Sequence, residues 1–185
     1  MKLKFVPFFL LLSVCAFAQQ KTTIATKTKN ISFPESFIGH WKGTLNWYPN
    51  GGETKQVETQ LIIKPTSTKN EYTWQIIYGA ALQDNRPYLL KKKDTIGNHW
   101  LIDEVNGIVL DSYWLGNRFI GAFSVSGNMI VDNYWLQNDE LHIEFISHNQ
   151  NAISTTGGKD EDNPNVNSYR LGSYQKGVLK RIITK

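Results

Sequence analysis

The chain has 185 residues, with 20 lysine and arginine residues, 16 aspartate and glutamate residues, and one cysteine. Its formal charge of +4 is weak and its basic residues are spread along the chain, which argues against a nucleic-acid surface, since such surfaces gather several cations on one face. The length suits one domain of ordinary size with a sizeable core.

Residues 1–18 have the pattern of a secretory signal peptide. Two lysines precede an apolar run at 5–12, and a small-residue triplet follows at 16–18. This order predicts cleavage after the triplet and an exported protein, either periplasmic or extracellular. Cys15 offers an alternative, a lipoprotein anchor, although Val14 stands where a lipobox usually carries a small residue.

The expected mature chain lacks cysteine, which excludes disulfides, thiolate metal sites and cysteine nucleophiles. No later apolar run reaches the roughly 18 residues that a membrane-spanning helix needs. Residues 19–33 are polar with few apolar anchors and are predicted to form a flexible leader. Residues 151–167 are polar and rich in glycine, which predicts a mobile loop before a last strand within 168–183.

Between these segments, short apolar-polar alternating runs are separated by turn residues at intervals typical of antiparallel strands. We find no amphipathic helical pattern there. The sequence therefore predicts an all-β domain over 34–183, a single antiparallel up-and-down β-barrel of about eight to ten strands, with a β-sandwich as the alternative.

Three turns, at 116–117, 127–128 and 138–139, each suit a two-residue hairpin and so fix a strand register. That register pairs Trp114 with Phe119. It also pairs Val125 with Ile130, Phe123 with Asp132, and Leu136 with Leu141. One face then gathers apolar residues, and Asp132 is the carboxylate expected among them.

The first predicted strand opens with Gly39-His40-Trp41, which resembles the Gly-x-Trp opening of the lipocalin and wider calycin families. Residues 42–49, which end in Tyr-Pro, extend the likeness to the nitrobindin-type branch. The resemblance implies a closed barrel that holds an apolar ligand or haem. It also implies that Trp41 plugs the barrel bottom beneath a basic residue of the last strand. Arg170, Lys180 and Arg181 are the candidates for that basic residue, with Gly39 as a further structural position.

The predicted function is non-catalytic binding of a small apolar or amphipathic molecule inside the barrel, without a cofactor. The expected ligand-binding residues are Trp47, Trp74, Tyr78, Ser112, Trp114, Phe123, Asp132 and Tyr134. Asp132 is the expected polar anchor, because a buried carboxylate is costly unless it has a partner or a task. The alternative for Asp132 is a structural ion pair with Arg170 or Arg86.

Two other functions stay open at this point. A packed barrel could serve as an interaction protein of the cell envelope through Tyr113, Trp135 and a loop at 84–87. A hydrolase could use a carboxylate pair drawn from Asp103, Glu104 and Asp111.

The histidines point to no metal or haem function. His142, Glu144 and His148 share one strand face, but that face is predicted to be exposed, so we expect surface residues and no metal site. None of the four histidines falls on the predicted inward face, which argues against a haem ligand inside the barrel.

Overall fold

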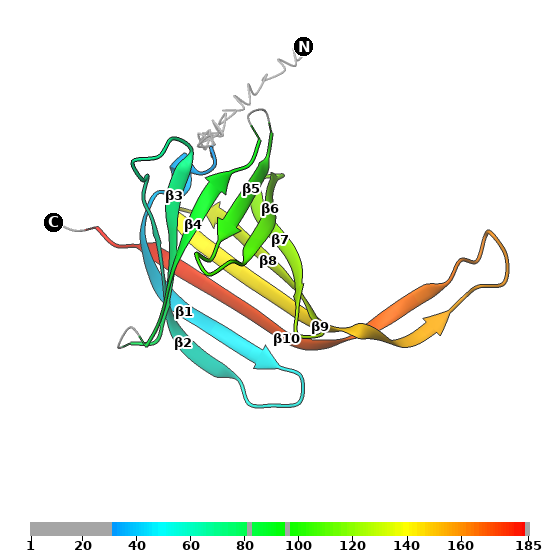
Figure 1. The fold of residues 1–185 in the computed structure, drawn as a ribbon. Coiled ribbons are helices and arrows are strands. Elements are labelled where there is room, and N and C mark those ends of the chain that lie inside the picture. Colours follow the sequence, from blue (N-terminus) through cyan, green and yellow to red (C-terminus); the bar gives the residue numbers. More distant parts are fainter. Residues whose placement is uncertain (1–30, 81–82, 95–96, 184–185) are drawn as a thin grey trace, which may run out of the picture. The chain divides into compact units, whose positions relative to one another are not determined.

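A computed structural model describes residues 31–80, 83–94 and 97–183 (Figure 1). The predicted signal peptide, Cys15 and the leader as far as residue 30 lie outside the described residues. Antiparallel neighbours close the sheet into a barrel in the order β1-β10-β9-β8-β7-β6-β5-β4-β3-β2, which confirms the predicted fold. The strands are β1 (Gly39–Pro49), β2 (Lys55–Ile63), β3 (Glu71–Tyr78), β4 (Asp84–Lys92), β5 (His99–Asp103), β6 (Val109–Leu115), β7 (Arg118–Val125), β8 (Asn128–Gln137), β9 (Glu140–Thr156) and β10 (Val166–Arg181). Within the described residues, we find no helix with the length and apolarity needed to span a bilayer.

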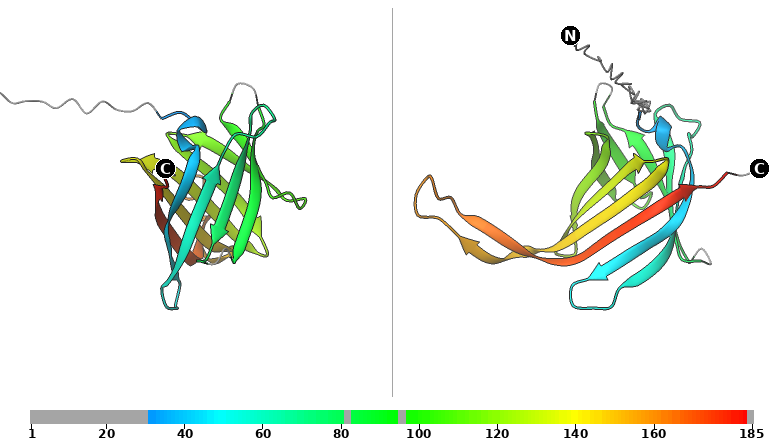
Figure 2. Two further views of the ribbon diagram at one scale, coloured as in Figure 1. Left: turned by 90° about the vertical axis from the view of Figure 1, so that its left-hand side faces the viewer. Right: turned by 180° about the vertical axis from the view of Figure 1, so that it is seen from behind.

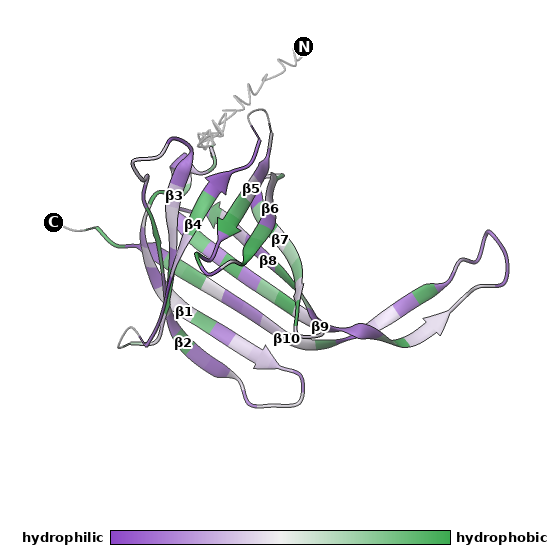
Figure 3. Cartoon of the chain, in the orientation of Figure 1, coloured by the Kyte–Doolittle hydropathy of each residue, from purple (hydrophilic) through white to green (hydrophobic). Residues whose placement is uncertain are grey.

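Alternation of apolar and polar side chains along the strands builds the barrel, because successive residues of a strand point to opposite faces. Figure 3 shows this alternation as hydrophobic and hydrophilic bands along the strands. On β1, Trp41 and Leu45 are buried while Thr44 is exposed. The inward set forms the core, and the polar set faces outward.

The predicted register holds at two of the three turns. Trp114 pairs with Phe119 and Leu136 pairs with Leu141, as expected. The remaining turn falls at 126–127, where both residues have positive φ, so Val125 pairs with Asn128. The predicted pairings of Val125 and Phe123 are therefore wrong by two positions, and the inward faces survive because side chains alternate with a period of two.

One end of the barrel is closed by the segment that precedes β1. The 3-10 helix η1 (Glu35–Phe37) buries Phe37 completely. Phe33 stacks on Trp114 and Phe119, with ring centroids 5.0 and 4.5 Å apart. Phe33 had been assigned to the flexible leader; its ring is instead part of the packing at this end, because aromatic area is large enough to be worth burying.

The distal halves of β9 and β10 extend away from the barrel as a two-stranded arm, which we define as residues 151–170 (Figures 1 and 2). Residues 151–156 and 166–167 are strand, so the predicted loop over 151–167 is too long. Within the described part of the chain the two strands of the arm pair with each other, and register shifts interrupt the pairing near Tyr169. Ile153 and Val166 are exposed on the arm.

We predict that the arm opens far more often than the barrel wall, because an isolated two-stranded hairpin is marginally stable in water. Hydrogen exchange should be on the order of 100-fold faster for amides of the arm than for those of 141–145, which lie within the closed sheet. Equal protection of the two segments would contradict this and would mean that something covers the arm.

Candidate ligand-binding site in the barrel

The eight predicted ligand-binding residues divide between two regions of the barrel interior. Trp74, Trp114 and Tyr134 belong to the packed core at the closed end. Ser112 is fully buried on the neighbouring part of β6. The other predicted residues lie nearer the opposite, open end, where the interior is not filled.

A cavity of about 520 Å³ occupies the open end. Its volume is in the range of small-molecule sites. Its walls are lined by Trp47, Tyr78, Arg86, Phe123, Val125, Ser126, Asn128, Ile130, Phe145, Ser147, Gly172, Ser173 and Gln175. The structure thus brings together three of the predicted residues, Trp47, Tyr78 and Phe123. A second, much smaller void of about 10 Å³ lies deeper, and Tyr78 and Phe145 line both spaces.

Trp47, which lines the cavity, carries a buried hydrogen-bond donor that has no partner. Its indole Nε1 is buried and makes no hydrogen bond within the described residues. The Lys55 ammonium lies 5.1 Å from the centroid of the indole ring. An unmade hydrogen bond of this kind costs free energy, so a ligand that supplies an acceptor at Nε1 would recover it.

Arg86 lies at the rim with its guanidinium 5.1 Å from the centre of the Tyr78 ring. The side chain of Asp84 accepts hydrogen bonds from Arg86 Nε at 3.1 Å and from Nη2 at 2.7 Å. This contact lowers the pKa of Asp84 and raises that of Arg86. The Arg86 charge is therefore already balanced, and Arg86 is not the partner of Asp132. Burial raises the pKa of Tyr78 to about 12, which keeps its phenol neutral at physiological pH.

Asp132 faces the interior but does not line the open cavity. It is 9% exposed and lies on β8 between Gly121 of β7 and Phe145 of β9. Burial raises its pKa to about 6, and the backbone amides of Gly121 and Asp132 only partly oppose that effect. Its Oδ1 has no hydrogen-bond partner within the described residues. The described residues therefore contain no ion pair between Asp132 and either Arg86 or Arg170, the alternative role that the sequence left open for Asp132.

The closed end carries the Trp41 plug that the resemblance implied, with a different cation. Trp41 Nε1 donates a 2.7 Å hydrogen bond to the Phe37 carbonyl. The Arg181 guanidinium lies 4.0 Å from the Trp41 ring centroid and donates to the carbonyls of Ile38 and Ser36.

Arg170, one of the three candidates for this position, is exposed on the arm, so that prediction is wrong. A Cβ at Gly39, where φ is +151°, would collide with the Arg181 guanidinium. This collision explains why a glycine opens β1 beside the Trp41 plug.

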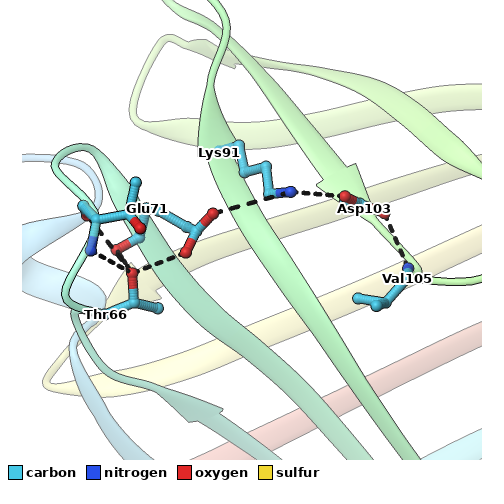
Figure 4. Close-up of polar contacts among 6 residues, drawn as sticks. Thr66, Glu71, Lys91, Asp103 and Val105 are labelled. Atoms are coloured by element: carbon cyan, nitrogen blue, oxygen red, sulfur yellow. Dashed lines mark hydrogen bonds and ion pairs between the residues drawn. The ribbon is translucent and has the colours of Figure 1, made fainter.

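Two of the three carboxylates proposed for a hydrolase, Asp103 and Asp111, are held in ion pairs on the outer wall, while Glu104 accepts a hydrogen bond from Asn106. Lys91 contacts Asp103 at 2.7 Å and Glu71 at 3.8 Å, as Figure 4 shows. Lys93 contacts Asp111 at 2.8 Å. These contacts lower the pKa values of Asp103 and Asp111, whereas a general acid needs a raised one. Neither Asp103 nor Asp111 therefore has the raised pKa that this role requires.

The structure also differs from the surface that was predicted for protein interaction. Residues 84–87 are not a loop but the start of β4. Tyr113 is exposed and stacks on His99 at 4.4 Å, while Trp135 lies between Arg118 and His142.

Within the described ranges, no group of three or more histidine, cysteine, aspartate or glutamate side chains is arranged to hold a metal.

Sequence reasoning missed Gln175, which lines the cavity from β10 beside Trp47. The pairing of Trp47 with Gln175 and of Gln175 with Phe145 places all three in one row around the barrel. Apolar alternation also indicates that Ile130 and Phe145 point inward, although neither is among the eight predicted ligand-binding residues. Gln175 carried no comparable signal, because the predicted loop before it left the register of the last strand open.

Neither a protein-family model nor a curated protein sequence matches the chain. Among solved structures, it is similar to a protein of unknown function from the DUF3598 family of Nostoc punctiforme, with 13% identity and a TM-score of 0.58 over 80% of this chain and 48% of that one. It is also similar to the S-type phycobiliprotein lyase CPES from Guillardia theta, with 10% identity and a TM-score of 0.52 over 82% of this chain and 91% of that one. The chain spans about half the length of the DUF3598 protein. These likenesses show a calycin-like, lipocalin-type barrel fold and do not distinguish the nitrobindin-type branch.

Proposed function

We propose that the protein is an exported, non-catalytic binding protein that holds a small amphipathic molecule in the open end of its barrel. The observation that carries the proposal is the cavity of about 520 Å³, whose walls combine aromatic and aliphatic residues with polar ones and include Trp47, the residue with an unpartnered indole N–H. Apolar walls with a few oriented polar groups are typical of small-molecule sites.

The walls favour an elongated apolar group. Phe123 and Ile130 are cross-strand neighbours on β7 and β8. Phe145 lies on β9 two positions from Ser147, the residue that pairs with Ile130, so the three apolar side chains belong to adjoining strands of one wall. Ser147 and Ser173 lie on the same wall, and their hydroxyl groups form a hydrogen bond of 2.9 Å with each other. Burial of a ligand's apolar surface against this wall supplies the main gain, at roughly 25 cal/mol per Å².

Export with the native signal, followed by native mass spectrometry, tests the proposal. A mass excess that disappears on denaturation would support a carrier and would give the mass of its ligand. A bare protein that also fails to bind amphipathic probes would contradict the proposal and would favour the interaction protein of the envelope.

A cavity-filling substitution should separate binding from folding. We predict that Ser173→Phe lowers the affinity for an amphipathic probe at least roughly tenfold, because the ring occupies space that the ligand needs. Ser124→Phe, on the exposed face of β7, is the matched control and should bind the probe as the wild type does. Fluorescence titration with 1-anilinonaphthalene-8-sulfonate measures both. Equal affinity in the two variants would place the probe elsewhere.

A further inference from the structure

Asp132 belongs to a belt of inward residues that runs around the barrel, and three members of this belt also line the open cavity. Cross-strand pairing places Ser112, Gly121, Asp132, Phe145, Gln175 and Trp47 in that order, from β6 to β1. The belt carries two unpartnered polar atoms, the Asp132 Oδ1 acceptor and the Trp47 Nε1 donor. Both atoms are buried, and Phe145 and Gln175 lie between the two residues along the belt.

The space beside Asp132 depends on a glycine. A Cβ at Gly121 would collide with Asp132 Oδ1 and would lie 3.0 Å from Ser112 Oγ. Gly121 also pairs directly with both of these residues across β6, β7 and β8. The absence of a side chain at this position therefore keeps room for the carboxylate and the serine hydroxyl on the interior face.

The surroundings of Asp132 are aromatic. Arg86, the cation that lines the cavity, is held by Asp84, so its charge is already balanced. Tyr78 and Tyr134 lie close enough to Asp132 that its charge raises their pKa values further. Aromatic faces attract cations, and a buried carboxylate gains more from a charged donor than from a neutral one.

We propose that the ligand carries a protonated amine that donates a hydrogen bond to Asp132, while its apolar part lies in the open cavity. This inference rests on the proposed function and specifies its ligand class. Phe145 connects the two regions, because it is the cross-strand neighbour of Asp132 and also lines the cavity. Tyr78 also lines the cavity, and the Asp132 charge raises its pKa, so its ring lies near both regions.

A pair of probes with the same tail tests the charge preference. Dodecylamine and dodecanoate differ in the sign of their head group, and isothermal titration at pH 8 measures the affinity of each for the exported protein. We expect the amine to bind roughly tenfold more tightly than the carboxylate, because a charge-assisted hydrogen bond replaces an unmade one. In Asp132→Asn this ratio should fall to about one.

Asp111→Asn is the matched control, since Asp111 is exposed on the outer wall and should leave the ratio unchanged. Circular dichroism verifies that each variant is folded. A carboxylate that binds as tightly as the amine, or an amine preference that persists in Asp132→Asn, would overturn the inference and leave the proposed function standing. If neither probe binds, and 1-anilinonaphthalene-8-sulfonate does not bind either, the proposed function fails as well.

Discussion

Trp41→Ala is expected to lower the free energy of unfolding by about 3–5 kcal/mol, the range for removing a large aromatic side chain from a core. Trp41 is 1% exposed, and its indole N–H donates a 2.7 Å hydrogen bond to the Phe37 carbonyl. The truncation leaves a cavity and removes that hydrogen bond. It also removes the surface on which the Arg181 guanidinium stacks. Urea denaturation followed by circular dichroism measures the change.

Arginine variants provide the matched control for this end of the barrel. Arg181→Ala removes the stacking on Trp41 and the donors to Ile38 and Ser36, so we expect a loss of about 1–3 kcal/mol. Arg170→Ala changes an exposed residue of the arm and should stay within about 0.5 kcal/mol of the wild type. A larger loss in Arg170→Ala than in Arg181→Ala would contradict the assignment of Arg181 as the partner of Trp41.

Asp132→Asn is expected to stabilise the barrel at pH 8 by about 1–3 kcal/mol, against the usual trend for core substitutions. The carboxylate is buried without a partner at Oδ1, and burial raises its pKa to about 6. The pKa of an ordinary aspartate in an unfolded chain is about 3.9, so ionisation of Asp132 costs free energy in the folded state. Asparagine keeps the shape and removes the charge.

The raised pKa of Asp132 also fixes the direction in which the stability of the protein changes with pH. A group whose pKa is higher in the folded state than in the unfolded state stabilises the fold fully at pH values below its unfolded pKa. This stabilisation is lost as the pH rises through its folded pKa. Between pH 5 and pH 8 the wild type should therefore lose about 1–2 kcal/mol relative to Asp132→Asn. Asp84 is the control, because the hydrogen bond from Arg86 lowers its pKa and Asp84→Asn should show no gain at pH 8. Parallel pH profiles for wild type and Asp132→Asn would contradict the burial of the ionised carboxylate.

The inward faces of the strands could be predicted from the sequence because they depend on local alternation. Leu136 and Leu141 flank a turn at 138–139 with two positive φ values, so a two-residue hairpin fixes their pairing without reference to the rest of the chain. The turn near Gly127 was less determined. Ser126-Gly127 and Gly127-Asn128 both suit such a turn, and the structure adopts the first. That choice places Gly121, and not Phe123, opposite Asp132.

The site depended on pairings between residues far apart in the chain. Trp47 and Phe123 share the cavity because β1 meets β10 and β10 meets β9, and no local pattern specifies how the barrel closes. Arg181 and Arg170 looked equivalent as partners of Trp41, yet the pairing of Trp41 with Arg181 brings only the former to the plug. The packing of Phe33 likewise required the rings of β6 and β7.

The sequence by itself determined that the chain forms an antiparallel all-β domain with an apolar interior and the carboxylate of Asp132 among its inward side chains. Periodicity and turn chemistry carry that information, and both act over a few residues. Only the tertiary structure decided which end of the barrel is filled and which end is open. That outcome depends on how side chains from all the strands fill a shared volume, which close packing settles for the molecule as a whole.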